Sequence, residues 1–163
     1  MLKKISLALL GILIALQFVQ PAKNVHPEPG AVEKDISTVF PLPDQIDKIL
    51  ITSCADCHSN NTRYPWYARI QPLAWWLNNH VEEGKKELNF NEFASYRPRR
   101  QYHKLEEIIE QVKEGEMPLK SYTLIHQNAK LNESQREELS SWANTLLDSM
   151  RVRYPADSLQ KKR

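Results

Sequence analysis

The two cysteines of this 163-residue chain stand three positions apart, in the stretch Cys54-Ala-Asp-Cys57-His58. Thiolate and imidazole are the donors that transition metals prefer, and two neighbouring thiols can also form a disulfide. The order Cys-x-x-Cys-His is in addition the attachment pattern of a c-type haem. Three chemistries therefore compete for this short stretch: a redox-active or structural disulfide, part of a zinc site, and covalent attachment of haem.

The first two chemistries lack the sequence context that they need. A thioredoxin-like dithiol follows a strand in a β-α-β unit, and no such pattern surrounds Cys54. A zinc site needs a second pair of ligands at close spacing, whereas His80, His103 and His126 are scattered along the chain. A structural disulfide with an incidental histidine is left as an alternative.

Haem attachment uses every member of the cluster. On one helical turn, positions i, i+3 and i+4 point to the same side. The thiols of Cys54 and Cys57 can then add to the two vinyl groups of a haem while His58 reaches the iron. The pattern favours one covalent haem c, with His58 as the proximal iron ligand.

The second axial position of the iron decides the chemistry. Met117 precedes Pro118 in a predicted loop, 59 residues after His58, and cytochromes c bring a loop methionine to the far face of the haem. Met150 lies on an apolar helix stripe, which is typical of a core methionine. His80 is the second candidate for the distal ligand, although a histidine on an apolar helix face is more often a core residue or a propionate contact.

The elements that must position these residues show a helical period. Predicted helices begin near Asp44, Pro72, Lys104 and Asn132, and the second and third end near Gly84 and Gly115. Asn132 can cap the last helix with Gln135 reaching back to it. The stretches 87–103 and 115–131 have mixed polarity and prolines, which indicates loops. Because no alternating strand pattern is present, the predicted fold class is all-α.

The N-terminal segment is apolar from residue 5 to residue 19 and follows Lys3 and Lys4, which is typical of a targeting segment. No small-x-small cleavage site follows it, so we expect an uncleaved signal-anchor helix over residues 1–22. The basic end then stays in the cytoplasm, and the domain faces the periplasm from the bacterial inner membrane. A cleaved signal peptide and a soluble periplasmic protein are the alternative.

The remaining chain divides by composition. Residues 23–43 are rich in proline and read as a tether, residues 44–152 as the haem-binding domain, and residues 153–163 as a polar tail. Without Lys3 and Lys4, 20 basic residues stand against 20 acidic ones, so bulk charge gives no support to nucleic-acid binding. The expected partners are the membrane, through the anchor, and a redox protein.

The chain resembles the small membrane-anchored haem-binding domain proteins of bacterial envelopes, a cytochrome c-like family with a single C-x-x-C-H. The likeness rests on CADCHSNNTRYPWY, NHVEEGKKELNF, YRPRRQYHKLEEI and GEMPLKSYTLIHQNAKL, and spans roughly residues 35–150. It implies a cytochrome c-like fold in which the helix ending at the cysteines crosses the last helix. It also implies covalent haem at Cys54 and Cys57, with His58 and Met117 as iron ligands.

These observations predict a monohaem cytochrome that transfers single electrons and is not an enzyme. A haem-based sensor or peroxidase, in which Met117 leaves the iron and His80 or an arginine acts on the bound ligand, is the alternative. A Cys-x-x-Cys disulfide protein without haem is the third hypothesis.

Overall fold

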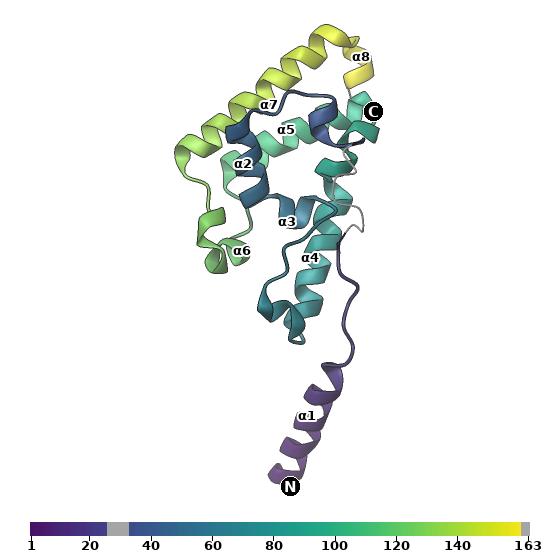
Figure 1. Ribbon diagram of the computed structural model, residues 1–163, viewed down its shortest axis with the longest axis vertical. Coiled ribbons are helices and arrows are strands. Elements are labelled where there is room, and N and C mark those ends of the chain that lie inside the picture. Colours follow the sequence, from purple (N-terminus) through teal and green to yellow (C-terminus); the bar gives the residue numbers. More distant parts are fainter. Residues whose placement is uncertain (26–32, 161–163) are drawn as a thin grey trace.

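The computed structural model describes residues 1–25 and 33–160, and the elements along them are helices (Figure 1). In chain order they are α1 (Leu2–Leu16), η1 (Ile36–Thr38), α2 (Asp44–Ser53), α3 (Ala55–His58), η2 (Trp66–Arg69), α4 (Leu73–Glu87), η3 (Phe90–Ser95), α5 (Pro98–Glu114), α6 (Lys120–Ile125), η4 (Gln127–Ala129), α7 (Glu133–Arg153) and α8 (Ala156–Leu159). Over the described residues, β-pairing is confined to an isolated bridge between Val25 and Asn61. The all-α prediction is confirmed for this part of the chain.

Helices α5 and α7 form the centre of the fold, where they lie side by side (Figure 1). Helix α2 packs against α7, which is the pairing that the family resemblance implied, and α8 packs against α5. The buried side chains of α7 include Trp142 and Met150, so Met150 is a core methionine as predicted. The indole N–H of Trp142 also donates to the carbonyl oxygen of Pro41, at 3.1 Å.

Two helix boundaries follow the expected local chemistry. Asn132 and Gln135 form a reciprocal cap at the start of α7, in which each side chain accepts a hydrogen bond from the backbone N–H of the other residue. Gly115 ends α5 with a φ of 73°, a left-handed conformation that glycine adopts without a Cβ penalty. Both predictions are confirmed.

The stretches predicted as loops contain more helix than expected. Helix α5 begins at Pro98 and not near Lys104, because proline is tolerated in the first turn of a helix. The preceding stretch forms η3, which buries Phe90 and Phe93, and the second stretch contains α6 and η4. In the polar tail, α8 buries Leu159. Burial of isolated apolar side chains, which shows no period, produced these short elements.

Helix α4 differs from its predicted face and end. It runs to Glu87, three residues beyond Gly84. The helical period of the sequence predicts that Trp76, Leu77 and Val81 share one buried face; Leu77 and Val81 are buried, whereas Trp76 is 45% exposed.

The predicted membrane anchor is wrong. Helix α1 has 15 residues, which at 1.5 Å per residue cover roughly 22 Å, short of a hydrocarbon core of about 30 Å. Across residues 1–25 and 33–160, no helix combines the length and apolarity needed to span a membrane. The predicted location, in the bacterial inner membrane with the domain facing the periplasm, depended on this anchor and is therefore wrong as well.

The segment predicted as a tether packs on the domain where the structure describes it. Asn24 is buried, and its side-chain amide donates to the carbonyl oxygen of Ser59 and to the hydroxyl of Thr62. Ile36 and Phe40 lie in the hydrophobic core. The proline-rich composition concealed these contacts, because single anchoring residues have no sequence period. Residues 26–32 of this segment lie outside the described residues.

Candidate functional site

The Cys-x-x-Cys-His stretch forms one short helical turn at the end of α2. Helix α2 ends at Ser53, and the backbone N–H groups of Cys57 and His58 both donate to the carbonyl oxygen of Cys54, at 3.2 and 3.0 Å. The predicted continuous helix is thus broken at Cys54, whose φ of −126° is not helical. The turn still brings the three residues of the motif close together. Both thiols are free.

His58 is oriented by a backbone carbonyl. Its Nδ1 lies 2.9 Å from the carbonyl oxygen of Leu88. Because a carbonyl oxygen only accepts, Nδ1 carries the proton and donates it, which leaves the lone pair on Nε2 for a metal. Burial lowers the pKa of His58, although the carbonyl oxygens of Leu88 and Gly84 act in the opposite direction. The neutral imidazole that an iron ligand requires is therefore favoured.

The turn is pressed against α4 at Gly84. A Cβ atom added to Gly84 would lie 2.7 Å from the carbonyl oxygen of Cys57 and 3.0 Å from its Cβ. Glycine is therefore required here by close approach of two backbones and not by its conformation. The sequence indicated Gly84 only as a helix end, since a glycine carries no signal of what packs on it.

An apolar cavity lies beside the turn. Its volume is about 270 Å³, or about 950 Å³ when the space that is open to solvent is included. The first value is close to the lower end of the roughly 300–1,000 Å³ of typical small-molecule pockets. Its walls are Leu50, Ser53, Cys54, His58, Glu87, Leu88, Phe90, Lys104, Glu107, Ile108, Gln111, Val112, Met117, Pro118, Leu131 and Leu139. Cys54 and His58 thus line one cavity together with Met117, which follows His58 by 59 residues in the sequence. Cys57 is not part of this wall and lies against Gly84.

Met117 reaches the cavity from the turn that follows α5. Its backbone N–H and that of Glu116 both donate to the carbonyl oxygen of Gln111, at 3.1 and 3.0 Å. Gly115 supplies the left-handed residue that lets the chain reverse there. The side chain of Met117 is half-buried.

His80 does not line this cavity. Its Nδ1 lies 2.8 Å from the carbonyl oxygen of Trp76, one helical turn earlier, and its ring packs on the Trp76 indole at 4.3 Å. The other two histidines considered for a zinc site are also paired away from the cavity, His103 with Glu106 and His126 with Tyr67. Met117 therefore shares a cavity with His58, whereas His80 lies outside this cavity.

Lys104 is a cavity residue that the sequence analysis missed. Its side chain is 11% exposed and lies 2.5 Å from Glu107 and 3.2 Å from Glu87. Although burial opposes the charge, the hydrogen bonds that Lys104 donates to these two carboxylates raise its pKa. The spacing of Lys104 and Glu107, at i and i+3 on α5, was a usable signal for the ion pair. It gave no sign that the pair borders a cavity.

These residues fit a haem. The walls are largely apolar, the imidazole has a free Nε2, a thioether lines the same space, and a cation stands at the wall. Burial raises the pKa of Cys54 to about 12 and that of Cys57 to about 11, which is unlike the low thiol pKa of redox dithiols. Among the residues that the structure describes, no three His, Cys, Asp or Glu side chains gather as metal ligands.

Comparison with known proteins gives one match. No curated protein and no solved structure matches the chain. Residues 11–145 match the haem-binding domain family, a span that includes the cysteine turn, α4, α5, Met117 and most of α7. The chain belongs to the haem-binding domain family.

Proposed function

We propose that this haem-binding protein is a monohaem c-type cytochrome that carries one electron at a time. The observation that carries the proposal is the common cavity of Cys54, His58 and Met117. Covalent attachment through Cys54 and Cys57 and axial binding by His58 and Met117 are parts of this proposal. A bound haem supplies a one-electron couple between Fe(III) and Fe(II), with the electron coming from and going to a redox partner protein.

The chain's own residues suit this role. The Leu88 carbonyl fixes the His58 ring, so that Nε2 is presented in one orientation. A methionine thioether opposite a histidine favours the ferrous state and raises the potential. The apolar wall acts in the same direction, because it lowers the dielectric around the more highly charged ferric form.

An electron carrier is favoured over an enzyme by the charged groups at the cavity. Lys104 donates hydrogen bonds to Glu87 and to Glu107, so none of the three is left as a free acid or base. Peroxidase chemistry needs a distal group that moves a proton, and His80 lies elsewhere. This supports a site that holds its ligands and does not turn over a substrate.

A haem-based sensor with an exchangeable distal ligand is the second candidate. One observation favours it: helix α6, which follows Met117, buries no side chain. A segment with so little apolar packing opens at low cost in free energy. In this candidate, Met117 leaves the iron when an external ligand binds.

Expression with the c-type maturation machinery tests the proposal. A pyridine haemochrome spectrum after acid extraction reports whether haem is covalently held. The far-red charge-transfer band of the ferric protein then reports the methionine bond, and carbon monoxide binding to the ferrous protein reports an open position. We expect covalent haem, the far-red band and weak carbon monoxide binding.

Each other outcome points to a different hypothesis. Tight carbon monoxide binding without the far-red band favours the sensor. Haem that is fully extracted by acid contradicts the c-type assignment. A chain that carries no haem and forms a Cys54–Cys57 disulfide favours the third hypothesis, a disulfide protein.

A further inference from the structure

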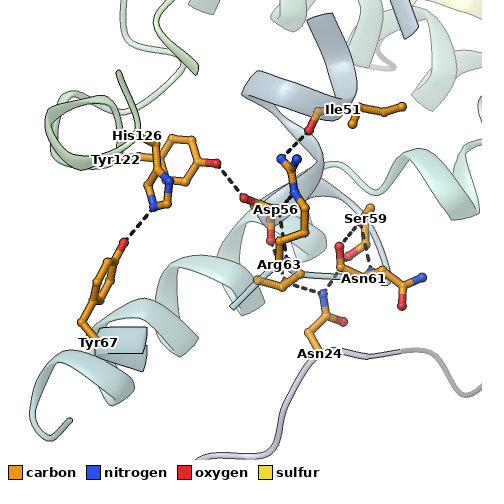
Figure 2. A network of polar contacts seen from close by, with 10 residues as sticks. Asn24, Ile51, Asp56, Ser59, Asn61, Arg63, Tyr67, Tyr122 and His126 are labelled. Carbon is orange, nitrogen blue, oxygen red and sulfur yellow. Dashed lines mark hydrogen bonds and ion pairs between the residues drawn. The ribbon is translucent and has the colours of Figure 1, made fainter. Parts of the chain in front are cut away.

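A buried carboxylate lies inside the haem-attachment motif itself. Asp56, between the two cysteines, is 8% exposed. Its Oδ1 accepts hydrogen bonds from the side-chain Nε and the backbone N–H of Arg63, at 2.9 and 3.1 Å. Its Oδ2 accepts a hydrogen bond from the hydroxyl of Tyr122, at 2.7 Å (Figure 2). Arg63 also donates to the carbonyl oxygen of Ile51 in α2.

Tyr122 belongs to α6, five residues after Met117. Its ring stacks on His126 with centroids 4.4 Å apart and the planes at 21°. His126 in turn shares a hydrogen bond with the hydroxyl of Tyr67 in η2, at 2.8 Å. Figure 2 shows these side chains as a continuous path from Tyr67 through His126 and Tyr122 to Asp56. The path joins α6, the segment after Met117, to the turn of residues 54–58, which we call the attachment turn.

Little else holds α6 in place. It buries no side chain, and Leu124 is 74% exposed. Upstream, Met117 is held through the backbone hydrogen bonds to Gln111. Met117 therefore lies between two fixed points, the end of α5 and the Tyr122–Asp56 hydrogen bond. Burial and the Asp56 bond raise the pKa of Tyr122, so its hydroxyl keeps the proton that it donates.

We propose that Tyr122 is a positioning residue for Met117. Its hydroxyl, bound to Asp56, ties α6 to the attachment turn and thereby holds Met117 at the cavity that His58 lines. The proposal rests on the proposed function, since it concerns the distal ligand of that site. The proposal gives Asp56 a role as the acceptor of the Tyr122 hydroxyl. The Cys-x-x-Cys-His pattern does not predict this role, because it leaves both residues between the cysteines unspecified.

The test is imidazole binding to the ferric holoprotein, since imidazole binds where the methionine leaves. Tyr122→Phe removes one oxygen and keeps the ring that stacks on His126. Because the lost hydrogen bond is to a charged carboxylate, we expect the imidazole association constant to rise by at least about tenfold. The far-red band should weaken in the same variant.

Tyr102→Phe is the matched control. This variant also removes a tyrosine hydroxyl from a charge-assisted hydrogen bond, the one that Arg151 donates to Tyr102 at 2.9 Å. That hydrogen bond joins α5 to α7 and does not involve α6. We expect it to lower the melting temperature without changing imidazole binding. If Tyr122→Phe lowers the melting temperature as much and leaves imidazole binding and the far-red band unchanged, the role of Tyr122 is structural and the proposal is wrong.

A second variant and a second measurement guard against loss of folding. Asp56→Asn keeps an acceptor for Tyr122 but loses the charge, and should raise the association constant by less than Tyr122→Phe. Hydrogen exchange of the wild-type holoprotein should show protection at residues 120–126; exchange there at the rate of an unstructured chain would contradict the proposal. The wild-type spectra test the proposed function, whereas only the difference between variants tests Tyr122.

Discussion

The two sides of the cavity are held in different ways. On the His58 side, the attachment turn is pressed against α4 at Gly84, where the two backbones leave no space for a methyl group. On the Met117 side, the chain is held by backbone hydrogen bonds to Gln111 and by the Tyr122 hydroxyl, while α6 buries no side chain. Close packing resists displacement more strongly than single hydrogen bonds do. If His58 and Met117 bind the iron as proposed, the His58 side is the more rigidly held of the two.

Removal of both cysteines should have the largest effect on the His58 side. We expect Cys54→Ser with Cys57→Ser to lose covalent haem and most of the cooperative fold, because the haem completes a small core. Haem retention after acid extraction and the thermal melting curve are the measurements. Cys57→Ser alone should also melt at a lower temperature, and a melting curve identical to that of the holoprotein would contradict the proposed stabilisation by haem.

Removal of the thioether should have the largest effect on the Met117 side. We expect Met117→Ala to lose the far-red band, bind carbon monoxide, and lower the reduction potential on the order of 100 mV, within the span of about 0.8 V that axial ligands control. His80→Ala is the control and should change none of these quantities. If the two variants behaved in the reverse way, His80 would be the distal ligand after all.

Gly84→Ala tests the packing of the proximal side. The added methyl group meets the carbonyl oxygen of Cys57 at 2.7 Å, and overpacking of this kind costs about 1–3 kcal/mol. Better helix propensity returns roughly 1 kcal/mol of that. Chemical denaturation should therefore show a loss of up to about 2 kcal/mol, with the far-red band intact. Gly11→Ala, in α1 with no atom near the new methyl group, serves as the control and should lose no stability.

Asn132→Ala gives the smallest expected effect. This variant removes the side-chain oxygen that accepts a hydrogen bond from the backbone N–H of Gln135 at the start of α7. The free energy of unfolding should fall by about 1 kcal/mol. Because the cap touches neither side of the cavity, imidazole binding should be unchanged. A rise in imidazole binding in this variant would mean that the Met117 side responds to global stability, and would remove the contrast between the two sides.

Local chemistry made part of the architecture predictable. The cap by Asn132 and Gln135 and the end of α5 at Gly115 depend on neighbours within a few residues, so the sequence alone was sufficient for both. The apolar stripe of α7 was readable for the same reason, since burial repeats along it with the helical period. The membrane anchor failed because apolar composition alone did not determine whether the helix was long enough to span a bilayer.

Contacts between distant segments were beyond the reach of the sequence. Burial also depends on which elements pack together, and no local period of the sequence indicates this. It places Ile36 and Leu159 in the core and leaves Trp76 exposed. The same holds for Lys104 at the cavity and for the Tyr122 hydroxyl on Asp56, 66 residues apart.

By itself, the sequence determined the Cys-x-x-Cys-His motif, the helical class and Met117 as the candidate for a distal ligand, because each depends on residue type and short spacing. Only the tertiary structure decided that Met117 and not His80 shares a cavity with His58. It alone decided how each side of that cavity is held, since close backbone approach at Gly84 and a hydrogen bond between α3 and α6 exist only once the helices have packed.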